Sequence, residues 1–230
     1  MASPLSSQEA SDAVGGLGWR FLLGTLRTSV PTGSLAGAAE AAALAVAACG
    51  DDADRHLRAD LRPAGAVLTL QSTDRADVTA LDVELAGRIS AALRRAGLRT
   101  ETGSGPDAPR SVQLLEVGID ALDIAAIRPF WKAVLGYDDE AGTDGPEAPL
   151  VDPVGQGPAI WFQQMDRPRP QRNRLHFDIC VPHDEAPRRI ADALAAGGRL
   201  VSADEAPAFW VLADREGNEA CVTTWQGRDG

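Results

Sequence analysis

The chain has 230 residues, with 22 Lys and Arg against 33 Asp and Glu, a formal net charge of −11 at pH 7, and 44% hydrophobic residues. A chain of this kind can bury a real core, and its length fits one large domain or two small ones. The negative charge argues against a broad electrostatic grip on nucleic acid or on an anionic membrane, because both are polyanions. We therefore expect neither as a partner, although a local basic patch remains open.

No apolar run approaches the length of a transmembrane helix, which needs about 20 residues. Residues 1–14 lack the basic and apolar regions of a secretory signal, which favours a cytoplasmic protein. The cysteines, Cys49, Cys180 and Cys221, are scattered and form no Cys-x-x-Cys pair. We expect three reduced thiols and no disulfide framework.

A polar segment at residues 100–110, TETGSGPDAPR, interrupts the apolar periodicity with Gly, Ser, Pro and charged residues. Such a composition is typical of a linker. We predict a first domain at residues 1–99, a linker at 100–110 and a second domain at 111–230. Residues 1–109 hold 10 basic and 13 acidic residues and the remainder holds 12 and 20, so the second domain is the more acidic one.

Residues 1–99 mix strand-like and helical patterns. One or two strands are predicted at 19–29 and another at 66–72. A helix at 79–96 is predicted from leucine and isoleucine residues that recur every four positions. A further helix is predicted at 34–49, and the face expected to be buried comprises Leu35, Ala38, Ala39, Ala42, Val46 and Cys49. This order favours an α+β fold in which helices cover one face of a small antiparallel sheet.

Residues 51–86 contain, in this order, Asp51, Arg55, His56, Leu57, Thr73 and Asp82. The order and spacing of these residues resemble the motif of the pterin-4a-carbinolamine dehydratases, and no gap is needed to align them. That motif is an acidic residue, His-His-Pro, a strand that ends in a third histidine, and an aspartate that opens the last helix. The resemblance extends more weakly over residues 4–98. It implies the dehydratase fold and a catalytic site formed by Asp51, Arg55, His56 and Asp82.

Two of the three family histidines are replaced, by Arg55 and Thr73, and only His56 is kept. Dehydration of a carbinolamine needs a base and an acid, and imidazole, with an unperturbed pKa of about 6.5, suits both tasks. Each lost acid or base costs about 100- to 10,000-fold in rate. Two alternatives stay open: His56 is a surface histidine on a polar connection, and Asp82 stabilises the N-terminus of a helix.

Residues 111–230 show one pattern twice. Strands are predicted at 112–119, 159–164, 175–181, 209–213 and 220–225, and helices at 124–135 and 186–196. The order of strand, helix and several strands occurs over 112–164 and again over 175–225, with a period of roughly 60 residues that indicates an internal duplication.

Four motifs stand out in this half: Phe130–Tyr137 (FWKAVLGY), Pro158–Gln164 (PAIWFQQ), Asn173–Asp178 (NRLHFD) and Ala213–Glu219 (ADREGNE). Together they resemble the vicinal-oxygen-chelate superfamily, most closely its glyoxalase-like, bleomycin-resistance-like branch. The resemblance implies paired βαβββ modules that form a cup. Phe130 and Trp131 lie on the predicted helix and are expected in the core, and the last motif is expected to form the turn before the final strand.

In metal enzymes of this superfamily four strands each supply one ligand, and the matching positions here are Glu116, Trp161, His176 and Cys221. Tryptophan cannot ligate a metal, so we expect no metal and no other cofactor. Without a metal the cup is a pocket, and its predicted ligand-binding residues are Glu116, Trp161, Gln163, His176 and Cys221. Such a lining suits a flat aromatic or heterocyclic molecule, although each tryptophan could instead fill a core.

Two functions follow. The first is a small-molecule enzyme resembling 4a-hydroxytetrahydrobiopterin dehydratase, a lyase that removes water, with degenerate catalytic histidines and a fused glyoxalase-like ligand-binding domain. The alternative is a non-catalytic binding or resistance protein that sequesters an aromatic small molecule in the C-terminal cup. Because members of the dehydratase family assemble through helices and sheet edges, the resemblance also implies a homo-oligomer.

Overall fold

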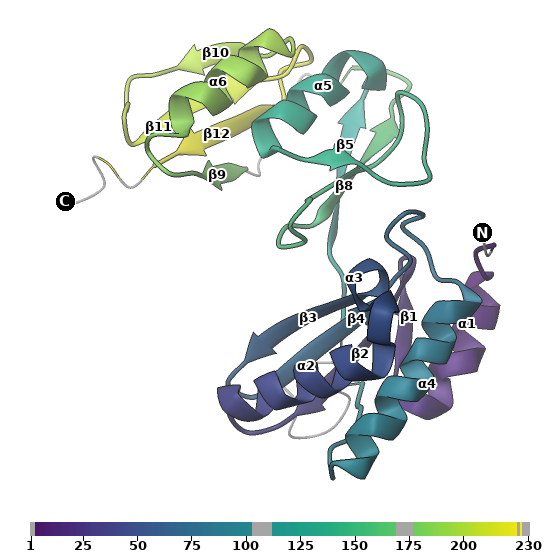
Figure 1. Cartoon of the computed structure of the whole chain (residues 1–230). Helices are drawn as coiled ribbons and strands as arrows, with labels where there is room; N and C mark the ends of the chain where they lie inside the picture. Colours follow the sequence, from purple (N-terminus) through teal and green to yellow (C-terminus); the bar gives the residue numbers. More distant parts are fainter. Residues whose placement is uncertain (1–2, 103–111, 169–176, 225, 227–230) are drawn as a thin grey trace. The chain divides into compact units, whose positions relative to one another are not determined.

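The computed structural model of the protein describes residues 3–102, 112–168, 177–224 and 226 (Figure 1). The chain divides into two compact units, residues 1–114 and 115–230. The first residues of the predicted linker pack on the N-terminal unit, since the Ser29 N–H donates to the Glu101 carbonyl at 2.7 Å. Within the described ranges, no helix is long and apolar enough to cross a membrane.

The N-terminal unit is built on a four-stranded antiparallel sheet with the strand order β1-β2-β4-β3. Its strands are β1 (Arg20–Leu22), β2 (Thr25–Pro31), β3 (Leu57–Arg62) and β4 (Gly65–Leu70). Three helices, α1 (Ser7–Val14), α2 (Leu35–Cys49) and α4 (Ala80–Arg95), lie on one face of the sheet, and the short α3 (Ala53–His56) leads into β3 (Figure 1). The predicted α+β class is confirmed.

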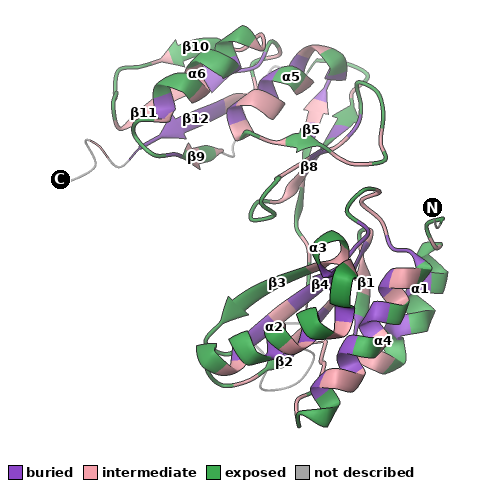
Figure 2. Ribbon diagram, in the orientation of Figure 1, coloured by how far each residue is buried: buried purple, intermediate pink, exposed green. Residues whose placement is uncertain are grey.

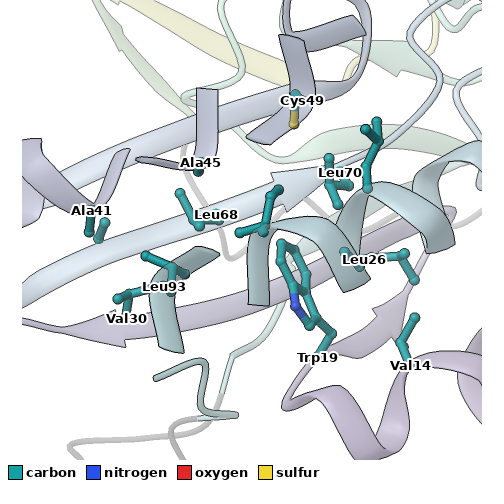
Figure 3. Close-up of a cluster of buried hydrophobic side chains, with 14 of the residues drawn as sticks. Val14, Trp19, Leu26, Val30, Ala41, Ala45, Cys49, Leu68, Leu70 and Leu93 are labelled. Atoms are coloured by element: carbon teal, nitrogen blue, oxygen red, sulfur yellow. The ribbon is translucent and has the colours of Figure 1, made fainter. Parts of the chain in front are cut away.

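The core of this unit lies between the sheet and the helices (Figure 3). Leucines at alternate positions of β2 and β4 point into it, among them the fully buried Leu26, Leu68 and Leu70. Trp19 is also fully buried, and its Nε1 donates to Ser90 Oγ at 2.9 Å. Because side chains alternate along a strand, the residues between these leucines point to the opposite face of the sheet.

The helix α2 buries a face that overlaps only in part with the predicted one, since Ala38 and Cys49 are buried as expected (Figure 2). Leu35 and Val46 are 54% and 49% exposed. The buried residues are Ala38, Ala41, Ala45 and Cys49. A helix that is apolar on nearly every side has no hydrophobic contrast from which to predict one face. Its contacts with α4 and the sheet, where small alanine side chains permit close approach, decide the face instead.

The edge strand β3 was not predicted, because its segment was interpreted as a polar connection. Its residues after Leu57 are all exposed, and Arg58, Asp60 and Arg62 alternate with apolar residues. Charged side chains are common on edge strands, where they discourage pairing with another chain. Because of its charged residues the segment was interpreted as a connection, although it forms a strand that pairs with β4 over its full length.

The C-terminal unit contains two modules with the same topology. The first has β5 (Glu116–Ala121), α5 (Ile124–Leu135), β6 (Asp138–Asp139), β7 (Leu150–Val151) and β8 (Ala159–Gln164), in the sheet order β5-β8-β7-β6. The second has β9 (Asp178–Cys180), α6 (Ala186–Ala195), β10 (Arg199–Ser202), β11 (Phe209–Ala213) and β12 (Glu219–Thr223), in the order β10-β11-β12-β9. In each module the first strand is parallel to the last. This repeated βαβββ topology agrees with the predicted duplication.

The strand predicted at 112–119 begins later, at Glu116. The Val112 N–H donates to the Thr102 carbonyl at 3.0 Å, so residue 112 packs with the N-terminal unit. The prediction placed the start of this strand too early, because the residues just before Glu116 are also mostly apolar.

A buried carboxylate joins the two modules of the C-terminal unit. Asp214 and Trp131 are both 0% exposed, and Trp131 Nε1 donates to Asp214 Oδ2 at 3.0 Å. Asp214 also accepts from the backbone N–H groups of Glu216 and Asn218 at 2.9 Å and from Asn218 Nδ2 at 2.8 Å. The predicted turn before the final strand and the predicted core position of Trp131 are confirmed, and the two features form one junction.

Candidate functional site

His56 and Asp82 meet at one end of the N-terminal sheet, although 26 residues separate them in the sequence. His56 Nδ1 lies 2.8 Å from Asp82 Oδ1, and the side chains are 11% and 0% exposed. Because a carboxylate oxygen accepts, Nδ1 carries the proton, and the neutral ring keeps its lone pair on Nε2. The arrangement therefore fixes the orientation and the tautomer of the imidazole.

The second oxygen of Asp82 belongs to a buried network at the start of α4. Asp82 Oδ2 accepts from the Thr79 N–H and Thr79 Oγ1 at 2.8 Å and from Ser72 Oγ at 2.9 Å. Thr79 is the N-cap of α4, so Asp82 completes a capping box. Asp82 therefore stabilises the helix and also orients His56, which is not the surface histidine of the alternative reading.

Asp51 and Arg55 lie outside this network. Asp51 is in a 3₁₀ turn before α3, Arg55 is in α3, and both are exposed. In the part of the chain that the structure describes, no hydrogen bond or ion pair joins either side chain to His56 or Asp82. The Thr73 N–H donates to the Arg55 carbonyl at 3.1 Å, so the two positions with replaced histidines are neighbours.

Sequence reasoning missed Ser72 and Thr79. Thr79 carries a local signal, because a threonine three residues before an acidic residue at the start of a helix is typical of a capping box. Ser72 carries no such signal, since it reaches Asp82 only when β4 and α4 pack together. The hydroxyls of Ser72 and Thr79 both donate to the Asp82 carboxylate, which in turn orients His56.

In the C-terminal unit, Trp161 and Gln163 lie on the face of β8 that is turned away from the core. Trp161 is 39% exposed, while the residues that alternate with it are buried in the core cluster. On the neighbouring strand β5, Gly118 pairs with Trp161, and an added Cβ there would lie 2.9 Å from the indole ring. The indole therefore lies over a glycine, with the exposed Glu116 on the same face, and the alternative of Trp161 as a core residue is wrong.

Cys221 lies on the sheet of the second module. It is 8% exposed in β12 and pairs with Asp178, while Cys180 in β9 pairs with Thr223 on the same face. His176 lies outside the described residues. The structure therefore brings three of the five predicted ligand-binding residues together on one sheet and places Cys221 on the other.

No group of three or more His, Cys, Asp or Glu side chains in the described ranges could hold a metal ion. Cys49, Cys180 and Cys221 all lie in the described ranges and form no disulfide. Burial, reinforced by Asp52, raises the pKa of Cys49 to about 11, so this thiol is protonated at neutral pH and is a poor nucleophile.

Comparison with known proteins assigns a family to the C-terminal unit. The family model of the glyoxalase-like domain matches residues 116–223, a range that begins with β5 and ends with β12. The C-terminal unit therefore contains a glyoxalase-like domain of the vicinal-oxygen-chelate type, as predicted. No curated protein matches the chain.

Several solved structures are similar to part of the chain. One is a glyoxalase/bleomycin resistance protein/dioxygenase family enzyme from Burkholderia phytofirmans PsJN, which is 21% identical in sequence. The match covers 49% of this chain and 98% of that chain, with a TM-score of 0.40. A glyoxylase/bleomycin resistance protein/dioxygenase domain from Frankia sp. EAN1pec has 19% identity over 53% of this chain and 96% of its own, with a TM-score of 0.37. The fosfomycin resistance protein FosX from Listeria monocytogenes has 11% identity over 52% and 96%, with a TM-score of 0.38.

Proposed function

We propose that the N-terminal unit is an acid–base site for the removal of water from a small carbinolamine of the pterin type. The observation that carries this proposal is the 2.8 Å contact between His56 Nδ1 and the fully buried carboxylate of Asp82. A buried carboxylate that orients an imidazole through one nitrogen leaves the other nitrogen to exchange protons with a substrate. The resemblance of the motif residues to the dehydratases supplies the substrate class.

The chemistry needs one proton to leave the substrate nitrogen and one to reach the departing hydroxide, so that water is the only product besides the dehydrated pterin. His56 Nε2 is proposed to take the first proton, and the resulting imidazolium is proposed to supply the second. Arg55, next to it in α3, is always charged and cannot act as a base. We assign Arg55 and Asp51 to substrate binding, and we expect a rate below that of a site with three histidines.

The test is a dehydration assay with a 4a-carbinolamine pterin, followed by its absorbance. We expect the wild-type protein to exceed the uncatalysed rate and His56→Ala to lose at least 100-fold of that gain. His183→Ala is the matched control, because His183 is an exposed histidine of the other unit and should leave the rate unchanged. A wild-type rate equal to the uncatalysed rate, or an active His56→Ala variant, would disprove the dehydratase proposal.

A second candidate function is the binding of a flat aromatic molecule by the glyoxalase-like domain. The exposed indole of Trp161 over Gly118 favours it, because an aromatic ring on an open sheet face offers a stacking surface. Glu116 and Gln163 lie on the same face and provide a carboxylate and an amide that could fix the orientation of a ligand. This arrangement fits a binding or resistance protein as well as an enzyme.

Thermal-shift measurements with a panel of aromatic and heterocyclic compounds test this second function. A ligand at 100 times its dissociation constant should add about 2.7 kcal/mol to the free energy of unfolding, and Trp161→Ala should lose that gain. Leu200→Ala removes a similarly exposed apolar side chain from β10, and this variant should keep the stabilisation by the ligand. A ligand that stabilises the wild type and Trp161→Ala equally would place binding elsewhere.

The homo-oligomer implied by the dehydratase resemblance remains a prediction. The outward side of α2 exposes Leu35 and Val46, at 54% and 49%. Contact with a second copy would remove such side chains from water.

A further inference from the structure

The turn between β1 and β2 carries an apolar side chain on a strained backbone. Leu22 pairs with Thr25, so the turn consists of Leu23 and Gly24, and both have positive φ, +44° and +66°. Two-residue turns of this kind favour asparagine or aspartate followed by glycine, because other side chains are strained at positive φ. Leu23 is also 54% exposed. Neither turn geometry nor burial in the core explains a leucine at this position.

A second strained residue lies against this turn. Among the described residues other than glycine, only Leu23 and Ala76 have positive φ. A Cβ added to Gly24 would lie 2.6 Å from the Ala76 carbonyl oxygen, so the turn and the loop after β4 are in close backbone contact. Strained backbone conformations cluster at functional sites, where the surrounding structure offsets their cost. Their meeting here marks this end of the sheet as part of a site.

The turn and the His56 site share a hydrogen-bonding residue, Gln71. The Gln71 N–H donates to the His56 carbonyl at 2.9 Å, and Gln71 Nε2 donates to the Gly24 carbonyl at 3.0 Å. Gln71 follows β4 at the end of the sheet where α3 lies (Figure 1). The turn and His56 therefore flank the end of β4 on opposite sides, with two strand spacings, about 10 Å, between their backbones. A molecule with two fused rings is long enough to contact both side chains.

The segment between them is held in place from several sides. The Ser72 N–H donates to the Asp77 carbonyl at 3.0 Å, and Ser72 Oγ donates to Asp82 Oδ2 at 2.9 Å. Gln71 Oε1 accepts from Arg58 Nη2 at 2.5 Å, which fixes the amide that holds the turn. The position of Leu23 relative to His56 is thus set by packing and hydrogen bonds, as a residue that contacts substrate requires.

We infer that Leu23 is a substrate-binding residue of the His56 site, and that its side chain contacts the ring system of the carbinolamine away from the reacting nitrogen and hydroxyl. The inference rests on the proposed dehydration for its class of substrate. A flat ring that covers an exposed leucine removes apolar surface from water, which stabilises the complex. The strained turn is what presents a leucine, rather than the preferred asparagine, at this point.

Equilibrium titration with biopterin, an oxidised pterin that lacks the 4a hydroxyl and cannot be dehydrated, tests the inference without turnover. We expect saturable binding to the wild-type protein, followed by the fluorescence of the pterin. Leu23→Asn should weaken it about 10-fold, because the apolar contact is lost. Leu23→Met keeps an apolar side chain and should bind like the wild type.

Leu61→Asn is the matched control. Leu61 is an exposed leucine of β3 that pairs with Ala66, at the end of the strand opposite to His56. The same change from leucine to asparagine should leave biopterin binding unchanged there.

Stability and kinetics separate a substrate contact from a merely structural turn residue. Asparagine adopts positive φ more readily than leucine, so Leu23→Asn should raise the urea midpoint of unfolding while it weakens binding. A residue with only a structural role would show the first effect alone. In the dehydration assay, Leu23→Asn should raise KM about 10-fold with kcat unchanged, because the contact is the same in the ground state and the transition state.

Three results would overturn the inference: no binding of biopterin to the wild type, equal binding to Leu23→Asn, or an equal loss of affinity in Leu61→Asn. These results differ from a failure of the proposed dehydration. A protein that binds biopterin through Leu23 without exceeding the uncatalysed rate retains the inference and loses the proposed function. Catalysis that depends on His56, with biopterin binding unchanged in Leu23→Asn, retains the function and removes the inference.

Discussion

Asp82→Asn lowers the free energy of unfolding by about 3 kcal/mol, because it converts a buried acceptor into a group with mismatched donors. Three donors point at Oδ2 and His56 Nδ1 points at Oδ1, in a side chain that is 0% exposed. Urea unfolding followed by circular dichroism measures the loss, and hydrogen exchange should show it first in α3 and α4. Asp54→Asn, an exposed carboxylate in α3, should change stability by less than about 0.5 kcal/mol.

The same variant separates the two roles of Asp82. If Asp82 orients His56, Asp82→Asn also lowers the dehydration rate by at least 100-fold, because the imidazole loses its fixed tautomer. Ser72→Ala removes one donor to Oδ2 and leaves the Oδ1 contact, so it should cost about 1 kcal/mol of stability with little change in rate. An Asp82→Asn protein that is destabilised but fully active would show that Asp82 only caps the helix.

Asp214→Ala lowers the free energy of unfolding of the C-terminal unit by about 4 kcal/mol, because it leaves buried donors without an acceptor. Trp131 Nε1, Asn218 Nδ2 and two backbone N–H groups all donate to this carboxylate. Urea unfolding followed by tryptophan fluorescence measures the effect, since Trp131 is at the junction. Asp144→Ala, an exposed carboxylate of the same unit, should change stability by less than about 0.5 kcal/mol.

A double-mutant cycle tests the origin of that loss. Trp131→Phe keeps an aromatic ring and removes the N–H, so its cost should be smaller in the Asp214→Ala background than in the wild type. Strictly additive costs would mean that the hydrogen bond between the modules contributes nothing, and that the loss comes from the turn alone.

The C-terminal unit was the more predictable of the two. The helix α5 begins and ends where predicted, because Asp123 caps it by accepting from the Ala126 N–H and Gly136 ends it with φ of +70°. The strands β8 and β11 also match their predicted bounds, since apolar residues alternate or run between turn residues. Local signals of this kind act over a few residues and can be seen without the fold.

The resemblance to the dehydratase motif placed both His56 and Asp82 among the predicted catalytic residues. It could not show that they touch, because the contact requires α3, β4 and α4 to assemble around Ser72 and Thr79. The exposure of Trp161 was equally undetermined, since a tryptophan in a strand faces the core or the open side according to the register. Gly118 on the next strand makes room for the indole there.

By itself, the sequence determined the α+β class and the positions of most helices and strands, because these depend on periodicity, caps and turns within short windows. The glyoxalase-like domain was predicted from the resemblance of four motifs. Only the tertiary structure decided the buried face of α2, the edge strand β3 and the contacts that join His56 and Ser72 to Asp82. Those features depend on which segments pair and in what register, and a register is set by packing between distant parts of the chain.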